Sequence, residues 1–375
     1  MRILTLLLLT VTVGWCRAAT FTIQHFGTPA NAQAAIQHAA DIWGDILVSD
    51  VPIKVSVSWT PLGSAALGVT FPNGRKDFNG APVAATWYAS ALANSIAGTE
   101  LNPGEDDINI YLNSGTNWYY GLDGNTPAAQ YDLVSIALHE LGHGLGFVGL
   151  AKKVGNEGSF GTLLASDFAP LITTFPWPQQ DTLPGIFDRF LTSTANGPLV
   201  DVANPSITLG AAFTSDQVHF NGPHAMEANG GQTARIYAPA TFALGSSCVH
   251  FNEATFPVGN ENELMTPFSA AGEANHWPGS VCIGVMRDIG WSVAPDVSIS
   301  EREPALIEVG PNPCHDLLMV RINVPLPAAR ITDLHGRTVI VHRTGSSVDV
   351  SALASGTYLF FPADGAVPVR FVKEH

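Results

Sequence analysis

The sequence predicts an α+β protein: a mixed sheet packed by helices and interrupted by a long insertion, followed by a small all-β sandwich. Three observations predict this class. Strand-like and helix-like patterns alternate over residues 20–145. Residues 151–245 then show few periodic segments and many Gly, Pro, Asn and Thr residues, which indicates a loop-rich insertion. From residue 305 onward, short alternating runs are separated by turn residues, as in a β-sandwich.

The elements before the insertion are predicted from their periodicity. Apolar residues that alternate predict strands, and apolar residues spaced three or four apart predict helices. In chain order these are a strand at 21–25, a helix at 30–47, a strand at 53–59, a Gly/Pro-rich stretch at 72–82, a helix at 84–96, a strand at 107–112 and a helix at about 131–145.

Regular structure resumes after the insertion. Met265-Thr266-Pro267 predicts a turn and Val281–Ile289 a helix. Six short strands are then predicted at 317–324, 329–334, 338–342, 348–350, 358–361 and 367–372. We therefore divide the chain into a signal peptide (1–19), a large domain (20–294), a linker (295–304) and a C-terminal β-sandwich domain (305–375).

The N-terminus has the pattern of a Sec-type signal peptide. Arg2 precedes an apolar core over Ile3–Val13, and Ala18 or Ala19 is the predicted cleavage point. The apolar run is too short to span a bilayer, and no other segment is predicted to cross one. We expect a protein that passes through the periplasm and is secreted or held at the cell surface.

Three cysteines lie outside the signal peptide. In an oxidising compartment Cys248 and Cys282 could pair, which leaves Cys314 as the odd one. No CxxC-type spacing occurs, so the sequence does not favour a cysteine zinc site.

The charge of the large domain is acidic. Residues 20–304 carry 26 acidic and 9 basic side chains, a balance of 9 − 26 = −17, which argues against nucleic acid as a partner. Calcium is a second candidate cofactor, with Glu105-Asp106-Asp107 and Asp123-Gly124-Asn125 as its candidate sites. Solvated acidic loops explain the same residues more simply than calcium sites do.

The run ALHELGHGLGF carries the most informative pattern. His139 and His143 are four residues apart, so on a helix both imidazoles lie on one face and can hold one cation. Glu140 beside them can handle the proton of an attacking water, which is the HExxH pattern of zinc hydrolases. The alternative is a surface helix with solvated side chains, but the apolar run Leu133–Leu138 favours a buried helix.

A catalytic zinc has three protein ligands and one open position, so a third ligand is needed. A compact metzincin pattern would place a histidine three residues after Gly146, where this chain has Gly149. The downstream candidates for the third ligand are Glu157, Asp167, Asp188, His219, His224, His250 and His276. Asp288 is a candidate for orienting a ligand histidine or, equally, a helix-surface residue.

The order of these pieces resembles the leishmanolysin-type branch of the metzincin zinc metalloproteases. The pieces are HELGHGLGF, a long insertion, His250-Phe251-Asn252 and then Glu263-Leu264-Met265-Thr266-Pro267. The resemblance implies His250 as the third zinc ligand and Met265 as the residue of the methionine turn beneath the metal. It covers the motif helix and about residues 245–292 and does not extend through the insertion.

The C-terminal region resembles the sorting domain of type IX secretion found in Bacteroidetes. Its matching pieces are Val309–Pro313, Ile331–Arg337 and Leu353–Tyr358, in this order and near the end of the chain. The resemblance implies that the type IX secretion machinery is a partner. The alternative is a β-sandwich that binds carbohydrate or a neighbouring protein.

Together these patterns predict a secreted zinc metalloendopeptidase that acts on protein or peptide substrates, with Glu140 as general base. The family pattern suggests that the 107–112 strand is a sheet edge to which an extended substrate adds. A gluzincin with Glu157 as third ligand is a second enzyme hypothesis. From a different class, the chain could be a non-catalytic, metal-stabilised adhesive or surface-binding protein.

Overall fold

The computed structural model describes residues 17–63, 66–172, 174, 176–177, 181–295, 307–322, 329–333, 337–342, 347–362 and 369–374. The chain forms two compact units, Met1–Val297 and Ser298–His375. Most of the predicted signal peptide, with Cys16, and most of the predicted linker lie outside the described residues. Among the residues described, no helix has the length and apolar character needed to cross a membrane.

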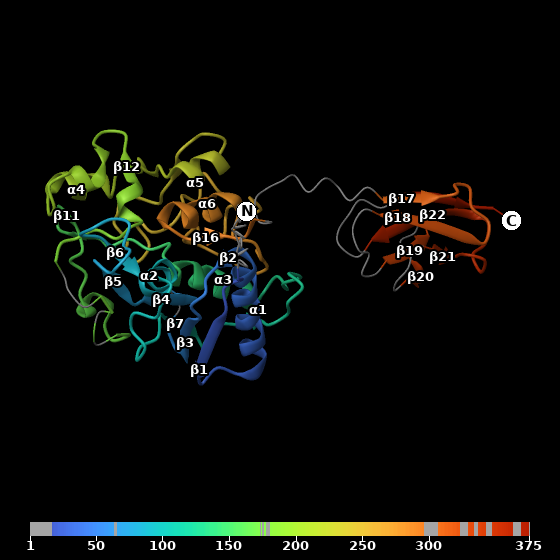
Figure 1. The fold of residues 1–375 in the computed structure, drawn as a ribbon, viewed down its shortest axis with the longest axis horizontal. Helices are drawn as coiled ribbons and strands as arrows, with labels where there is room; N and C mark the ends of the chain where they lie inside the picture. The colour runs from blue at the N-terminus through green and yellow to red at the C-terminus, as the bar shows by residue number, and fades with distance from the viewer. Residues whose placement is uncertain are drawn as a thin grey trace, which may run out of the picture. The chain divides into compact units, whose positions relative to one another are not determined.

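A mixed four-stranded sheet forms the lower part of the first unit in the view of Figure 1. Strands β1 (Phe21–Phe26), β3 (Ile53–Thr60) and β7 (Ile108–Asn113) are parallel, and β4 (Gly68–Pro72) runs antiparallel to β7. The order β1-β3-β7-β4 places β4 at the edge. The prediction that the 107–112 strand lies at the edge is therefore wrong. This strand, β7, lies inside the sheet because the short strand β4, which the sequence did not predict, pairs with its outer side.

Two helices pack against each other over this sheet. The α1 helix (Ala30–Ile46) buries Ile36 and Trp43, and the indole Nε1 of Trp43 donates to the carbonyl oxygen of Leu138 at 2.9 Å. Leu138 belongs to α3 (Leu133–Gly144), the predicted motif helix. Packing of α3 against β4 and β7 fixes its place over the edge half of the sheet. The predicted mixed α+β architecture is confirmed.

The predicted helix at 84–96 is shorter than expected. Only α2 (Ser90–Ala97) is helical, and it ends at Gly98 in the left-handed conformation. Before it, β6 (Trp87–Ala89) pairs with β5 (Gly74–Lys76), and the backbone N–H of Trp87 donates to Pro184 at 3.0 Å. These long-range backbone hydrogen bonds hold residues 87–89 in an extended conformation, although the local periodicity predicts a helix there.

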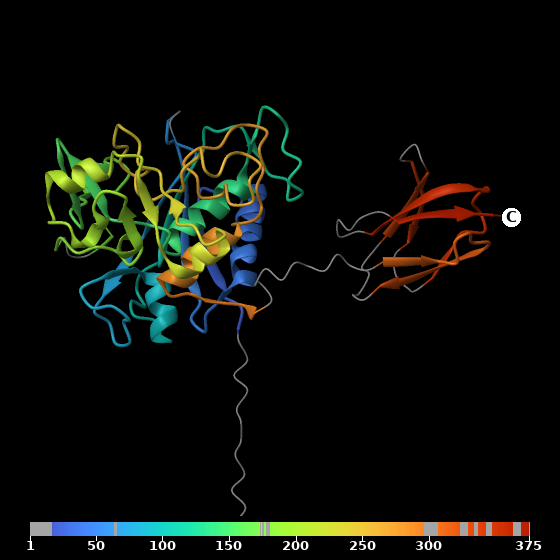
Figure 2. The same ribbon diagram turned by 90° about the horizontal axis from the view of Figure 1, so that it is seen from above.

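The insertion is more regular than its sequence predicts. Its strands and helices are β10 (Ala151–Val154), β11 (Glu157–Phe160), β12 (Leu191–Ser193), β13 (Gly197–Pro198), β14 (Val218–Phe220), β15 (Ala234–Arg235), α4 (Ile207–Ala212), α5 (Pro223–Ala228) and the 3-10 turns η1 (Ala165–Phe168), η2 (Asp188–Phe190) and η3 (Leu199–Asp201). Strands of two to four residues are too short to show a period. Both views place the green segments of the insertion on the side of the unit opposite α1, and the yellow α5 beside α6 (Figure 2).

Residues near both ends of the first unit bind one internal segment, which contains the strand β2 (Leu47–Val48). Strand β2 pairs with β16 (Ser292–Val293), which follows α6 (Ser280–Ile289). Ala19 donates to Leu47 at 2.9 Å and Ala294 donates to Ile46 at 2.9 Å. We call these three segments, Arg17–Ala19, Ile46–Ser49 and Ser292–Ala294, the terminal clasp. A second short parallel pair, β8 (Trp118–Tyr119) with β9 (Tyr131–Asp132), leads into α3.

The second unit consists of two antiparallel sheets. One contains β17 (Ile307–Gly310), β18 (Leu317–Ile322) and β21 (Ser347–Asp349), and the other contains β20 (Thr338–His342), β19 (Ala329–Asp333), β22 (Gly356–Pro362) and β23 (Val369–Lys373). Leu318 and Val348 of the first sheet share a buried cluster with Phe360 and Phe371 of the second. The prediction of all-β structure in this region is confirmed.

The pairing of Cys248 with Cys282, which the sequence allows, does not occur in the structure. Cys248, Cys282 and Cys314 are free thiols, and all three are fully buried. Cys248 lies in a loop and Cys282 on α6. Each thiol packs among apolar side chains of the core and is not bonded to the other sulfur.

Candidate metal centre

The ends and the glycines of α3 place the motif residues. The Asp132 carboxylate caps the helix by accepting the backbone N–H of Ser135 at 2.7 Å, and Gly146 takes φ +120° just after the helix. A Cβ on Gly142 would lie 2.8 Å from the Met265 sulfur. The helix therefore needs glycine where another side chain packs directly on its backbone.

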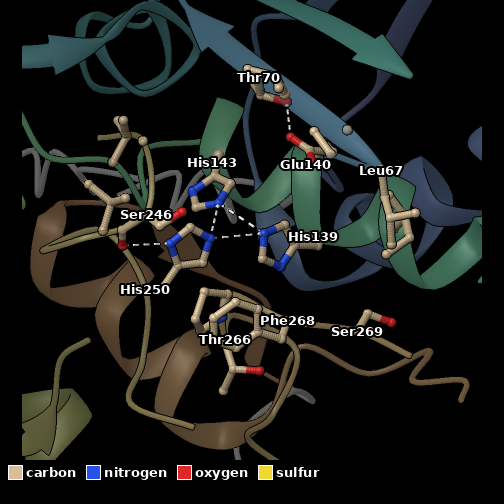
Figure 3. Close-up of a pocket in the computed structure, with 18 of the residues that line it drawn as sticks. Leu67, Thr70, His139, Glu140, His143, Ser246, His250, Thr266, Phe268 and Ser269 are labelled. Carbon is tan, nitrogen blue, oxygen red and sulfur yellow. Dashed lines mark hydrogen bonds between the residues drawn. The ribbon is translucent and has the colours of Figure 1, made fainter. Parts of the chain in front are cut away.

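Three histidine rings meet above α3 (Figure 3). His139 and His143 project from neighbouring turns of the helix, and His250 enters from the segment after the insertion. Their Nε2 atoms are separated by 3.0 Å (139 to 143), 3.1 Å (143 to 250) and 3.2 Å (139 to 250). In the parts of the chain that the structure describes, this is the one cluster of three residues suited to holding a metal.

Backbone pairing fixes the position of His250. The carbonyl of His250 accepts the N–H of Tyr237 at 2.8 Å, and the next residue, Phe251, donates its N–H to the carbonyl of Met265 at 2.8 Å. The segment is therefore held on one side by the end of the insertion and on the other by the turn that contains Met265.

The hydrogen bonds at Nδ1 decide where the ring protons lie. Nδ1 of His139 faces the Leu264 carbonyl at 2.7 Å, that of His143 faces the Phe147 carbonyl at 2.7 Å, and that of His250 faces the Ser246 carbonyl at 2.9 Å. A carbonyl oxygen only accepts, so each Nδ1 must carry the proton. In the neutral rings, all three Nε2 atoms therefore carry lone pairs that face one another. The Nε2 contacts drawn as dashed lines in Figure 3 then have no proton to share and cannot be hydrogen bonds.

This donor set fits a cation. Burial lowers the pKa of all three imidazoles, to about 3 for His250, so the rings are neutral near pH 7 and cannot relieve the repulsion by protonation. Nitrogen ligands about 2.0–2.1 Å from a tetrahedral Zn²⁺ lie about 3.3 Å from each other. The observed separations of 3.0–3.2 Å are close to that geometry.

Glu140 lies beside the histidines without joining their triangle. Its side chain is directed toward β4, where its Oε2 accepts a hydrogen bond from the Thr70 hydroxyl at 2.6 Å. Burial raises the pKa of Glu140 to about 7, and the Thr70 hydrogen bond opposes that rise. A carboxyl group with this pKa exchanges protons readily near neutral pH.

Met265 packs against α3 at Gly142, between His139 and His143 in sequence. Its side chain is fully buried, and its sulfur packs on Gly142 of α3. The turn that follows, Thr266–Pro267, lines the same cleft as His139 and His250. The structure thus brings together all five predicted site residues: His139, Glu140, His143, His250 and Met265.

The other candidate ligands lie elsewhere. Glu157 is exposed on β11, Asp167 pairs with Lys152, Asp188 accepts two backbone N–H groups, His219 faces Thr233, His224 lies near Glu227, and His276 hydrogen-bonds Asp132. Asp288 neither orients a histidine of the cluster nor lies free on a helix surface. It accepts the backbone N–H groups of His224 and Ala225 and so caps α5.

The acidic groups proposed for calcium take part in protein hydrogen bonds. Asp107 accepts from the backbone N–H of Lys54 and from Asn94, both at 2.9 Å, and Glu105 pairs with Arg75. Asp123 accepts from the Tyr119 hydroxyl at 2.6 Å. Calcium at either place stays a prediction.

The three histidines and Glu140 open into a cleft of about 570 Å³. One wall is the edge strand β4, and the opposite wall comes from the segments around Ser246 and Thr266. Exposed apolar side chains at its border include Leu244, Val258 and Phe268, and its charged side chains other than Glu140 are Glu253, Glu263 and Glu273. The cleft is large enough for several residues of an extended peptide.

Two parts of the chain are similar to known families. Residues 88–176 match the SPBPB7E8-like family, and this stretch contains His139, Glu140 and His143. Residues 308–366 match the secretion system C-terminal sorting domain. No curated protein matches the chain. The second match supports the sequence resemblance: the protein carries a sorting domain for the type IX secretion machinery, which indicates export and a secreted or cell-surface location.

Gly68 and Thr70 are site residues that the sequence did not predict. A Cβ on Gly68 would lie 2.5 Å from Oε1 of Glu140, and Thr70 binds the other oxygen of the same carboxylate. The G-V-T-F-P run has a short strand-like alternation, but it stands beside Gly- and Pro-rich sequence. A hydroxyl 70 residues before the motif carries no local signal of its role.

Proposed function

We propose that the first unit is a secreted zinc-dependent endopeptidase of the leishmanolysin-like metzincin type. His139, His143 and His250 would hold the zinc ion through Nε2, and Glu140 would be the general base. One observation carries the proposal: three Nε2 lone pairs converge in a cleft beside a buried carboxylate that is not itself a ligand.

The number of ligands favours catalysis over a purely structural metal. Structural zinc sites are closed by four protein ligands, whereas catalytic sites keep a position open. Three protein donors are present among the described residues, and the cleft leaves room at the fourth position. A bound zinc ion supplies Lewis acidity, which lowers the pKa of water and polarises a carbonyl group.

Glu140 is suited to moving the proton. In its ionised form it can take a proton from a water molecule in the cleft and then give that proton to the leaving amine of the peptide. The burial that raises its pKa to about 7 makes both steps accessible near neutral pH. The neighbouring Thr70 hydroxyl holds one carboxylate oxygen and leaves the other for this exchange.

The substrate would be a peptide in an extended conformation. Among the strands that the structure describes, β4 pairs only with β7, which leaves its other edge free, and its residues Gly68–Pro72 line the cleft. Unpaired backbone groups on such an edge can bind an extended peptide as an added strand. This assigns to β4 the role that the sequence suggested for the 107–112 segment.

The test is a zinc analysis combined with an assay on casein, with and without a chelator, using the full chain. We expect about one zinc ion per chain and hydrolysis that stops with chelator and returns with zinc. Glu140→Gln should keep the zinc and lower hydrolysis by about 10²- to 10⁴-fold, the usual contribution of a general base. Glu227→Gln, an exposed glutamate on α5, is the matched control and should retain full activity. Undiminished hydrolysis by Glu140→Gln would refute the assignment.

A further inference from the structure

The carboxylate of Glu140 is held by two residues of the edge strand. We infer that Gly68 and Thr70 are positioning residues that fix Glu140 in its working orientation. The inference rests on the proposed function and goes beyond it, because it gives β4 a second role besides binding substrate.

The two contacts are complementary. The Thr70 hydroxyl donates to Oε2 of Glu140 at 2.6 Å, the short length of a bond to a charged acceptor. The Cβ that Gly68 lacks would lie 2.5 Å from Oε1 and 2.8 Å from both Cγ and Cδ of Glu140. Residues 68 and 70 are two apart on a strand and therefore face the same side. One residue binds the carboxylate while the other leaves the space that it occupies.

Thr70 supplies the one hydrogen bond to this side chain within the described part of the chain. A glutamate has three rotatable side-chain bonds, and ordering such a chain costs up to about 2 kcal/mol. Without the hydroxyl, the Glu140 carboxylate would be free to leave the orientation seen in Figure 3. Positioning errors of about 1 Å can lower rates by about 10²-fold.

The strand does not depend on Glu140 for its own place. Thr70 pairs with Ile110 and Gly68 with Leu112 in the register of β4 and β7. Ile108 of β7 in turn packs where Gly144 of α3 has no side chain. The edge strand and the motif helix are therefore fixed to each other by the sheet, and the Thr70–Glu140 bond spans two elements that are already rigid.

The test compares Thr70→Val, which removes only the hydroxyl, with Thr70→Ser, which keeps it, and Gly68→Ala, which fills the space. We expect Thr70→Val to lower kcat by about 10- to 100-fold and Gly68→Ala by about 100-fold, with zinc content unchanged and KM altered less than about twofold. Thr70→Ser should stay within about threefold of the natural protein.

The matched control is Thr28→Val, which removes a buried hydroxyl that faces the Val57 carbonyl, away from Glu140. It should leave kcat unchanged even where it lowers stability. A Thr70→Val enzyme with the natural kcat, or a loss no larger than that of Thr28→Val, would overturn the inference.

Crystal structures separate this inference from the proposed function. If casein is not cleaved, the endopeptidase proposal fails, and the position of Glu140 in Thr70→Val still decides the inference. We expect its carboxylate to be displaced or disordered in Thr70→Val and in place in Thr70→Ser. A carboxylate unmoved in Thr70→Val would refute the positioning role.

Discussion

Replacing Asp188 by Asn should make the protein less sensitive to alkaline unfolding. Asp188 is fully buried, and its Oδ2 accepts the backbone N–H groups of Leu150 and Gly185. Its Oδ1 has no hydrogen-bond partner among the residues that the structure describes. Burial raises its pKa from the ordinary value of 3.8 to about 7. The folded state therefore binds this proton more tightly than the unfolded state.

The direction of the pH effect follows from that difference. The stability contributed by protonated Asp188 is fully present below about pH 4 and falls as the pH rises through about 7. With these two values, the natural protein loses about 2.6 kcal/mol between about pH 5 and about pH 8 through Asp188 alone. An asparagine at this position would be neutral throughout and can still accept both backbone N–H groups through its amide oxygen.

The assay is urea unfolding of both proteins in the presence of a chelator, so that no bound metal adds its own pH dependence. The free energy of unfolding of Asp188→Asn relative to the natural protein should rise by about 2–3 kcal/mol over that pH range. Asp45→Asn, an exposed carboxylate on α1, should show no such rise. A difference for Asp188→Asn that stays flat or falls with pH would show that the reasoning is wrong.

Two further substitutions test the histidine cluster and the packing beneath it. His250→Ala should leave two histidine ligands and lower the affinity for zinc by at least about 10-fold in a chelator competition. The control His219→Ala, on β14, should bind zinc as the natural protein does. Equal affinities in the two variants would exclude His250 as a ligand. Gly142→Ala should lower the free energy of unfolding by about 1–3 kcal/mol, because the new methyl group would lie 2.8 Å from the Met265 sulfur and that overpacking exceeds the gain in helix propensity. A urea midpoint at or above that of the natural protein would show that Met265 moves aside freely.

The larger elements of the fold could be predicted because their patterns are long enough to read. The α1 helix keeps Ile36 and Trp43 on one face over 17 residues, and β3 alternates over eight. Strands β4, β5 and β6 could not be predicted in the same way. They have three to five residues, and backbone pairing with distant partners such as Pro184 determines them.

The residues of the candidate site also differ in how far the local sequence predicts them. His139, Glu140 and His143 are local, because a helix places positions i and i+4 together whatever surrounds it. His250 lies 107 residues beyond His143, and only the resemblance to leishmanolysin-type metzincins selected it from the seven downstream candidates. Thr70 contacts Glu140 only because β4 adds antiparallel to β7, a pairing that depends on the whole sheet.

The terminal clasp has a consequence for processing of the exported chain. Hydrogen bonds join Ala19 and Ala294 to neighbouring residues of the same segment, Leu47 and Ile46. The last residues of the predicted signal peptide (1–19) and the last residues before the predicted linker (295–304) thus bind the same segment, Ile46–Ser49. Cleavage of the chain beyond Ala294 would leave the β2–β16 pair and the hydrogen bond from Ala294 to Ile46 intact, whereas signal-peptide cleavage after Ala19 would remove the Arg17–Ala19 segment from the clasp.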